Sequence, residues 1–201
     1  MKLYIWPGAC SLSPHIVARE AGIDLELKQL DRGERKTADG VVLSNINGKN
    51  QVPVLELDDG EMLTEGPVIA QYLADRKPGS DLLPAAGTMA RYRVQEWLNY
   101  LTSEVHKTYA PMFRPNTPDD FKGTLRDFLG QRYDWINQKL AGKHYLTGDK
   151  FTVADAYLFV MLRWAPRVGI DLSKWPNIVA YMDRINARPK VQEALKAEGL
   201  A

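Results

Sequence analysis

The first 77 residues alternate between short runs of strand-forming residues and amphipathic helical segments. Residues 2–6 are mainly β-branched and aromatic and stop at Pro7-Gly8, which is typical of a strand that ends in a turn. The pattern next predicts a helix over residues 11–22, a strand over 25–30, a hairpin of 54–57 and 61–63, and a helix over 65–76. The order is β-α-β, a connecting segment, then β-β-α. We therefore expect an α/β domain with a four-stranded mixed sheet over residues 1–77.

After Lys77-Pro78-Gly79-Ser80-Asp81 the strand pattern disappears and helical periodicity takes over. Apolar residues at helical spacing predict a long helix over residues 88–112, which the prolines at 115 and 118 end. Further helices are predicted over residues 119–140, 152–168, 176–187 and 190–198. The chain is thus expected to have a linker over residues 78–87 and an all-α domain over 88–201.

The segment F-T-V-A-D-A-Y, residues 151–157, contains a helix-start signal of the [ST]-x-x-[DE] type. Thr152 can accept from the Asp155 N–H, while Asp155 reaches back to the Thr152 N–H. The following helix is apolar nearly all round, so it is expected to cross the core of the helical domain.

Composition and charge exclude several classes of function. The 201-residue chain has a formal charge of +1 and no run of lysine or arginine, which argues against a nucleic-acid partner. Its longest apolar stretch, residues 157–162, is too short to span a membrane, and its single cysteine cannot form an internal disulfide. The three histidines lie far apart, with no metal-ligand spacing. A cytoplasmic protein without a metal is predicted.

Cys10 is the first candidate for chemistry because it precedes a predicted helix. Unpaired N–H groups and the positive end of the helix dipole favour a thiolate there and can lower the thiol pKa. The alternative is a half-buried cysteine that acts as a small apolar side chain. No second cysteine completes a C-x-x-C motif, so exchange through Cys10 would need an external thiol.

Two short segments offer backbone groups to a ligand. Val52-Pro53 precedes a strand, and a cis bond there would turn the Val52 N–H and C=O outward, where they could pair with an extended peptide. Glu65-Gly66 opens a helix, whose N–H groups suit a carboxylate while Glu65 suits an ammonium group. Taken alone, an ordinary strand start and an ordinary helix start explain both segments equally well or better.

His106 and Lys107 lie on a polar side of the long predicted helix, opposite Trp97 and together with Asn99. This side must face solvent, a partner or a cleft, and solvent is the default for a polar helix face. His106 could instead donate to a ligand.

The combination of these features resembles the cytosolic glutathione S-transferases. The features are the β-α-β and β-β-α order, Val-Pro before the third strand, Glu-Gly at the last helix of the first domain, and the F-T-V-A-D box. The opening P-G-A-C-S-L-S-P-H and the His106-Lys107 pair are similar, more narrowly, to the bacterial beta class. The resemblance spans the whole chain. It implies a thioredoxin-like first domain that binds glutathione as co-substrate, a helical domain that carries most of the hydrophobic-substrate pocket, and a homodimer.

The resemblance also implies roles for individual residues. Cys10 would lie beside the glutathione sulfur, Val52 with a cis Pro53 would pair with the cysteinyl backbone, and Glu65 and the Gly66 N–H would hold the γ-glutamyl group. His106 and Lys107 would line the second-substrate side, with His106 acting in catalysis. The remaining glutathione contacts would come from Arg35, Asn99 and Glu104, the last from across the dimer interface.

The chain departs from this family pattern at three places. Gly66 stands where the family commonly has serine, so one hydroxyl contact is absent. Ile5-Trp6 stands where a tyrosine is frequent, and Arg35-Lys36 where a lysine at position 35 is frequent. These changes affect the surroundings of the thiol and of the glycyl end of glutathione.

The sequence thus predicts a transferase that conjugates the glutathione thiolate to hydrophobic electrophiles in detoxification. One alternative is glutathione-dependent thiol-disulfide exchange through Cys10. Another is a non-catalytic dimeric binding module with the same fold.

Overall fold

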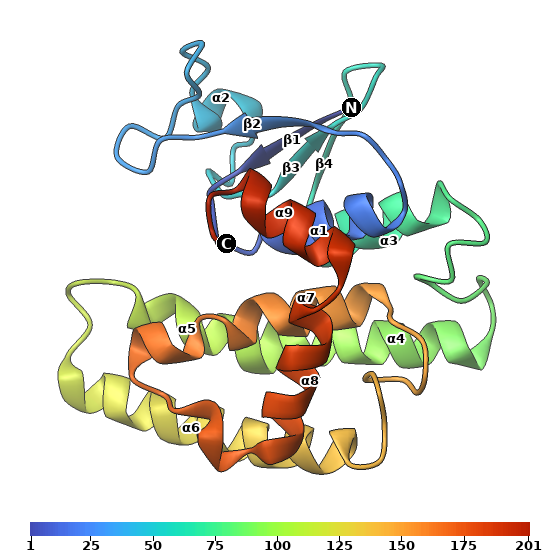
Figure 1. The fold of residues 1–201 in the computed structure, drawn as a ribbon. Coiled ribbons are helices and arrows are strands. Elements are labelled where there is room, and N and C mark those ends of the chain that lie inside the picture. Colours follow the sequence, from blue (N-terminus) through green and yellow to red (C-terminus); the bar gives the residue numbers. More distant parts are fainter. The chain divides into compact units, whose positions relative to one another are not determined.

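The computed structural model describes residues 1–201, which divide into two compact units. The first unit comprises Met1–Leu83 together with Ala187–Ala201, and the second comprises Pro84–Asn186 (Figure 1). The boundary between Leu83 and Pro84 lies inside the predicted linker. The C-terminal residues differ from the prediction, since 187–201 belong to the first unit and not to the helical one.

The first unit contains the predicted four-stranded mixed sheet in the order β2-β1-β3-β4. β1 (Lys2–Ile5) pairs in parallel with β2 (Glu26–Gln29) and antiparallel with β3 (Val54–Glu56), which pairs antiparallel with β4 (Met62–Thr64). The parallel pair requires a crossover connection, which the helix between β1 and β2 supplies.

Helices cover both faces of this sheet (Figure 1). α1 (Leu12–Glu20) and α3 (Gly66–Asp75) lie on one face, where their apolar sides bury Leu3, Ile5 and Leu55 of the strands. The short α2 (Leu43–Ile46), which the sequence pattern did not predict, lies on the other face. Its Leu43 packs with Tyr4 and Val54, so a single helical turn, too short to show periodicity, completes the core.

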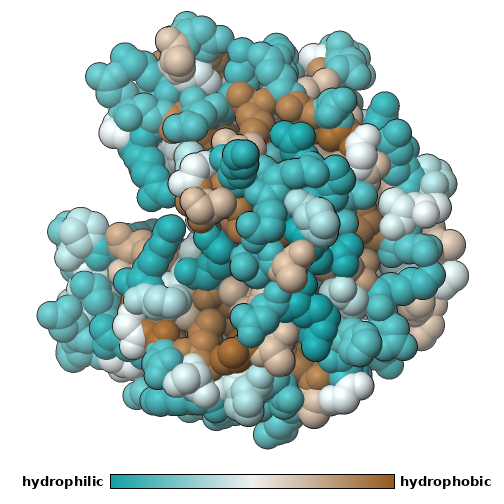
Figure 2. All heavy atoms as spheres, in the orientation of Figure 1, coloured by the Kyte–Doolittle hydropathy of each residue, from teal (hydrophilic) through white to brown (hydrophobic).

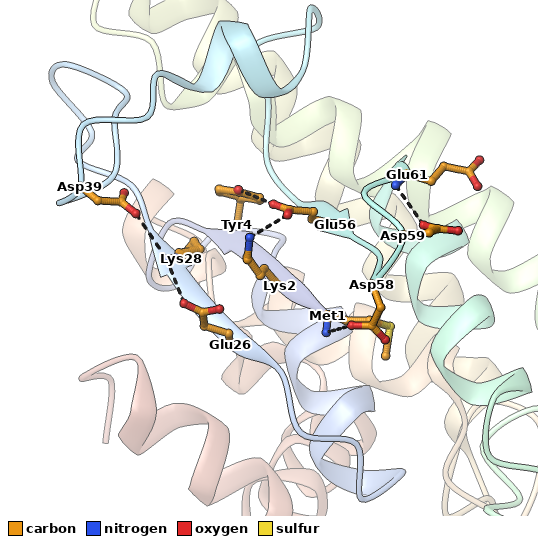
Figure 3. Close-up of polar contacts among 10 residues, drawn as sticks. All are labelled: Met1, Lys2, Tyr4, Glu26, Lys28, Asp39, Glu56, Asp58, Asp59 and Glu61. Carbon is orange, nitrogen blue, oxygen red and sulfur yellow. Dashed lines mark hydrogen bonds and ion pairs between the residues drawn. The ribbon is translucent and has the colours of Figure 1, made fainter.

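The rest of that outer face is polar and paired (Figure 3). Lys2 Nζ lies 2.7 Å from Glu56 Oε1, and the Tyr4 hydroxyl donates to Glu56 Oε2 at 2.7 Å. Burial, and then the Glu56 carboxylate, raises the pKa of Tyr4 to about 12. Since each polar group has a partner, this face needs no apolar cover.

The C-terminal helix α9 (Pro189–Ala197) packs against α1. Arg188 forms a two-pronged ion pair with Glu20, at 2.7 and 2.8 Å. At the other end, the buried Glu198 carboxylate accepts from the Gly8 N–H at 2.9 Å and lies 2.9 Å from His15 Nδ1. These contacts, together with buried Val191 and Leu195, explain why α9 belongs to the first unit.

The second unit is helical, as predicted. It consists of α4 (Met89–Tyr100), a π-helix (Leu101–His106), α5 (Lys107–Met112), α6 (Asp119–Leu140), α7 (Val153–Leu162) and α8 (Pro176–Asn186), with 3₁₀ turns at Ala165–Val168 and Leu172–Lys174. The predicted helix over 88–112 is thus interrupted by a π-helical segment. The predicted helix over 152–168 ends at Leu162, and Pro166, which lacks an N–H, falls in the 3₁₀ turn that follows.

The capping box at the start of α7 is confirmed. Asp155 Oδ2 accepts from the Thr152 N–H and from the Thr152 hydroxyl, both at 2.8 Å. Asp155 Oδ1 accepts from the Leu146 N–H at 2.9 Å and from the Tyr181 hydroxyl at 3.0 Å. α7 is buried along its whole length, in agreement with the predicted core position.

The side of each unit that Figure 2 shows is mostly hydrophilic, with hydrophobic residues in separate patches.

Candidate active site

Cys10 lies in the turn between β1 and α1, where its thiol donates to the Val52 carbonyl over an Sγ–O distance of 3.3 Å. The backbone N–H groups of Cys10 and Ser11 also donate hydrogen bonds to the Cys10 sulfur. The Ser11 hydroxyl holds the turn by donating to the Trp6 carbonyl and accepting from the Trp6 N–H. The thiol therefore lies among backbone groups of its own turn and of the segment before β3.

The Cys10 thiol is not the low-pKa group that its position at a helix start suggests. Burial raises the pKa of the Cys10 thiol to about 12, and the Glu65 carboxylate acts in the same direction. The N–H groups of Cys10 and Ser11 act in the opposite direction, but their effect is smaller. Although part of the residue is accessible, desolvation of the sulfur outweighs the helix start, so Cys10 is a neutral thiol at neutral pH.

The Val52-Pro53 peptide bond is cis. Gly66, the first residue of α3, lies against the Pro53 ring: a Cβ there would be 3.6 Å from Pro53 Cγ. That is an ordinary van der Waals distance, so space alone does not require a glycine. Cys10, Val52, Pro53 and Gly66, distant in sequence, are thus brought together in the first unit.

Glu65 is next to this group, with its backbone in the left-handed region at a φ of 72°. Its exposed carboxylate accepts from Lys49 Nζ at 2.6 Å, and the same ammonium donates to the Thr64 hydroxyl at 2.9 Å. Glu65 is therefore able to hold an ammonium group, and in this structure the ammonium group comes from Lys49.

Arg35 lies on the connecting segment and is exposed, also with a left-handed backbone (φ 55°). Its guanidinium donates to the Asn50 carbonyl at 3.5 Å and lies 5.8 Å from the centre of the Trp6 ring. Arg35 is thereby tied to the segment that leads into Val52. Its charge remains available at the surface of the first unit.

The other predicted residues belong to the second unit. Asn99 is exposed on α4, and Glu104 lies in the π-helix, where its carboxylate pairs with Arg132 at 2.8 Å. Lys107 is exposed at the start of α5. These three residues share one helical stretch of the second unit.

His106 is partly buried, not simply solvent-facing. Its Nδ1 lies 2.7 Å from the Tyr157 hydroxyl, and its ring packs edge-on to Tyr157 and tilted against Trp164, with ring centres 5.8 and 5.2 Å apart. The predicted polar helix face is therefore packed against aromatic residues at this point. Pattern analysis of one helix could not show this, because the partners come from α7 and the turn after it.

Several residues of the site have no sequence signal. The Lys49 ammonium donates to Glu65, and the Ser11 backbone N–H donates to the Cys10 sulfur, yet neither residue belongs to a motif of polar spacing. Tyr157 reads as one apolar position of a buried helix, and Glu198 as one acid near the C-terminus. Only the fold brings their polar atoms to the turn that holds Cys10 or to His106.

No group of three or more His, Cys, Asp or Glu side chains in the structure is arranged to hold a metal ion. None of the helices combines the length and apolar character that a membrane crossing needs.

Comparisons with known proteins agree with this architecture. Residues 8–76 match the glutathione S-transferase N-terminal domain and residues 102–189 match its C-terminal domain. The chain is 46% identical to glutathione S-transferase GstA of Escherichia coli O157:H7 over the full length of both proteins. It is 35% identical, again over the full length of both, to glutathione S-transferase GST-4.5 of Xanthomonas campestris pv. campestris.

Solved structures are similar over the same extent. BphK, a bacterial glutathione S-transferase solved as a ternary complex, superposes with a TM-score of 0.97 at 50% identity, covering all of both chains. A sphingomonad glutathione S-transferase complexed with glutathione gives 0.96 at 46% identity with full coverage, and the beta-class enzyme of Sphingomonas chungbukensis gives 0.96 at 45%, also with full coverage.

The thioredoxin-like unit followed by a helical unit is the two-domain arrangement of the glutathione S-transferases, since the two family models match one domain each. The chain belongs to the glutathione S-transferase family and is an enzyme with glutathione as its co-substrate. Within this family it is of the bacterial beta class.

Proposed function

We propose that this enzyme conjugates the glutathione thiolate to hydrophobic electrophiles and serves in detoxification in the cytoplasm. The observation that carries the proposal is the contact between Cys10 and the Val52 carbonyl. It brings the turn before α1 to the segment before β3, with Glu65 and Gly66 beside them.

Each part of glutathione has a matching group in the first unit. The Val52 backbone pairs with the cysteinyl backbone, as an added strand would. Glu65 and the N–H groups at the start of α3 hold the γ-glutamyl ammonium and carboxylate, in agreement with the ammonium that Glu65 already holds. Arg35 is close enough to the Val52 segment to attract the glycyl carboxylate.

Conjugation requires glutathione to be ionised near neutral pH. Lowering a thiol pKa of about 8.5 by two units needs about 2.7 kcal/mol of preferential thiolate stabilisation. A hydrogen bond to a charged group contributes about 1.5–3 kcal/mol, so one or two donors are sufficient. The N–H groups of Cys10 and Ser11, which act on a sulfur at this position, and the imidazole of His106 are the proposed donors.

The electrophile binds in the helical unit, where His106 and Lys107 line the second-substrate site. His106 lies among Tyr157 and Trp164, so a polar donor is combined with aromatic surface. Such a combination suits an aromatic electrophile that must be positioned against a thiolate.

The test is the initial rate at which the purified protein conjugates glutathione to an activated aryl halide, from about pH 5.5 to 8. We expect a rate above the uncatalysed one, with an apparent pKa well below that of free glutathione. The absence of any enzymatic rate would contradict the proposal.

Thiol-disulfide exchange through Cys10 is less well supported, because a thiol with a pKa of about 12 supplies little thiolate. Replacing Cys10 with alanine separates the two activities. We expect Cys10→Ala to lower conjugation only in part while any exchange activity is abolished. An equal loss of both would show that Cys10 is the nucleophile in each. A non-catalytic module would instead show weak or no glutathione binding.

We propose further that the enzyme is a homodimer, in which Asn99 and Glu104 reach the glutathione site and Glu104 does so from the partner subunit. The exposed apolar side chains of Met89 and Tyr92 on α4 support a partner surface. Light scattering after gel filtration is expected to give twice the chain mass of 22.7 kDa. A mass equal to one chain would exclude the dimer.

A further inference from the structure

Arg35 carries an exposed positive charge on a fixed piece of backbone. Its N–H donates to the Asp31 carbonyl at 3.0 Å, and its carbonyl accepts from the N–H of buried Leu43 at 2.8 Å. The side chain beyond Cα is long, and an unrestrained arginine loses much rotamer entropy when a ligand fixes it. Any contact that already holds the guanidinium in place therefore favours binding.

Two groups of the first unit contact this guanidinium. The Asn50 carbonyl accepts from Arg35 Nη1 at 3.5 Å, a long and therefore weak hydrogen bond. The centre of the Trp6 ring lies 5.8 Å from Arg35 Cζ, within the range of a cation–π interaction. A carbonyl and an indole ring restrain the guanidinium without neutralising it, so Arg35 keeps its charge for an anionic ligand.

Trp6 directly follows β1, and its ring is fixed by packing and by the backbone. The ring packs against the core cluster that contains Tyr4 and Val52. The Trp6 N–H donates to the Ser11 hydroxyl at 3.2 Å, and the Trp6 carbonyl accepts from that hydroxyl at 3.1 Å. The indole is therefore a rigid surface at the end of β1, next to the turn that holds Cys10.

The indole N–H does not explain why a tryptophan occupies position 6. Nε1 of Trp6 is buried and has no hydrogen-bond partner, and a buried donor without an acceptor lowers stability. A phenylalanine would offer apolar surface to the core without this cost. The indole offers one advantage over the phenyl ring, because its face attracts a cation more strongly. The cation on this face is Arg35.

We propose that Trp6 is a positioning residue that holds the Arg35 guanidinium in the orientation in which it binds the glycyl carboxylate of glutathione. The inference rests on the proposed contact between Arg35 and this carboxylate and deepens it. A planar guanidinium can lie on the indole face and still direct the N–H groups at its edge toward a carboxylate. Trp6 and Arg35 are two positions at which the chain departs from the family pattern, and the structure places them in contact.

The test compares the binding of glutathione with that of its glycyl ethyl ester, which has the same thiol and γ-glutamyl group but no glycyl charge. Isothermal titration calorimetry gives both dissociation constants. We expect the wild-type protein to bind glutathione about tenfold more tightly than the ester, the effect of one hydrogen-bonded charge. Arg35→Gln is expected to abolish this preference. Arg32→Gln is the matched control and is expected to keep it, because Arg32 is exposed on the same segment and donates to the Pro7 carbonyl.

Trp6→Leu removes the ring face and keeps an apolar side chain. We expect it to weaken glutathione binding about two- to fivefold, the effect of an exposed cation–π contact, while binding of the ester changes by less than about 1.5-fold. A purely structural role would weaken both ligands alike. In the Arg35→Gln background, Trp6→Leu is expected to have no further effect on the preference, because Trp6 acts through Arg35. Trp6→Phe, which keeps an aromatic face, is expected to retain most of the preference.

NMR of the wild-type protein without ligand measures the contact itself, and it does so even if Trp6→Leu does not fold. Protons held over an aromatic ring are shifted upfield by the ring current. We expect the side-chain δ and ε protons of Arg35 to lie upfield of those of Arg32, which is equally exposed but bonds to a backbone carbonyl. Arg35→Gln and Arg32→Gln identify the two sets of signals.

Equal weakening of both ligands by Trp6→Leu would overturn the inference, as would an unchanged preference or Arg35 protons at the shifts of Arg32. Failure of the proposed function gives a different result. If Arg35→Gln preferred glutathione over the ester as strongly as the wild-type protein does, Arg35 would not hold the glycyl carboxylate, even with the Trp6 contact present.

Discussion

Cys10 and Val52 are 42 positions apart in the chain, yet a thiol-to-carbonyl hydrogen bond joins them. At the scale of single residues, the type and rough location of the site were predictable, but the chemical state was not. The sequence indicates a helix start, which favours a thiolate, whereas the fold desolvates the sulfur and raises the Cys10 pKa. Desolvation depends on neighbours from other elements, which no local pattern describes.

The protonation state of Cys10 predicts its reactivity. Because only the thiolate reacts, and burial raises the pKa to about 12, the rate of alkylation by iodoacetamide is expected to rise about tenfold per pH unit without a plateau below about pH 10. At neutral pH the rate is expected to be at least about a hundredfold below that of glutathione. Cys10→Ala is the control for other sites of modification. A plateau below about pH 9 would show an unshifted or lowered pKa.

The ion pair between Lys49 and Glu65 predicts that Lys49 competes with glutathione for the Glu65 carboxylate. Its ammonium occupies the carboxylate that the γ-glutamyl ammonium of glutathione would use. Lys49→Met is therefore expected to lower KM for glutathione by about two- to fivefold, the range of an exposed ion pair, while Glu65→Gln raises it. Steady-state kinetics with varied glutathione measure both. An increase of KM in Lys49→Met would mean that Lys49 itself holds the ligand.

At the scale of elements, the period of the apolar positions predicted the strands and the longer helices well. The helix over 119–140 has the predicted bounds, and the hairpin and the first parallel pair are confirmed. The misses are short or irregular. α2 has one turn, and the π-helix changes the angular position of its residues without changing their polarity. His106 lies in that segment, which is why its predicted surroundings were incomplete.

The capping box of α7 predicts a loss of stability. Thr152→Ala removes a hydroxyl from the buried Asp155 carboxylate and is expected to lower the free energy of unfolding by about 1–2 kcal/mol. Thr152→Ser keeps the hydroxyl and serves as the matched control, with a smaller loss. Urea unfolding measures both variants. Equal losses would show that the methyl group, not the hydroxyl, is responsible.

At the scale of the whole molecule, the division into units does not follow the order of the chain, because the first unit contains both ends of the sequence. The sequence predicts a linker over residues 78–87 and assigns all of residues 88–201 to the helical domain. In the structure, residues 187–201 belong to the first unit. There the Glu198 carboxylate accepts from the Gly8 N–H, in the turn before Cys10, and pairs with His15. A helix carries no signal in its own sequence for the unit against which it packs.

Glu198 predicts coupling between the C-terminus and the first unit. Glu198→Ala leaves the buried His15 ring and the Gly8 N–H without their acceptor, and is expected to lower the free energy of unfolding by about 3 kcal/mol. Glu193→Ala is the control, with a change within about 0.5 kcal/mol, because Glu193 is exposed on α9, the helix that precedes Glu198, and its carboxylate pairs with Lys190. Thermal and urea unfolding measure the difference, and equal effects would rule out a buried anchor at Glu198.

The sequence by itself determined the class of each unit, the strand and helix order, and the segments that contain Cys10, Val52-Pro53 and Glu65-Gly66. These features are local: a period, a turn or a cap is written within a few consecutive residues. Only the tertiary structure decided the state of the Cys10 thiol, the pairing of Tyr157 with His106, the ammonium on Glu65 and the membership of α9. Each of these depends on burial and on distances between residues far apart in the chain, which are set when the elements pack.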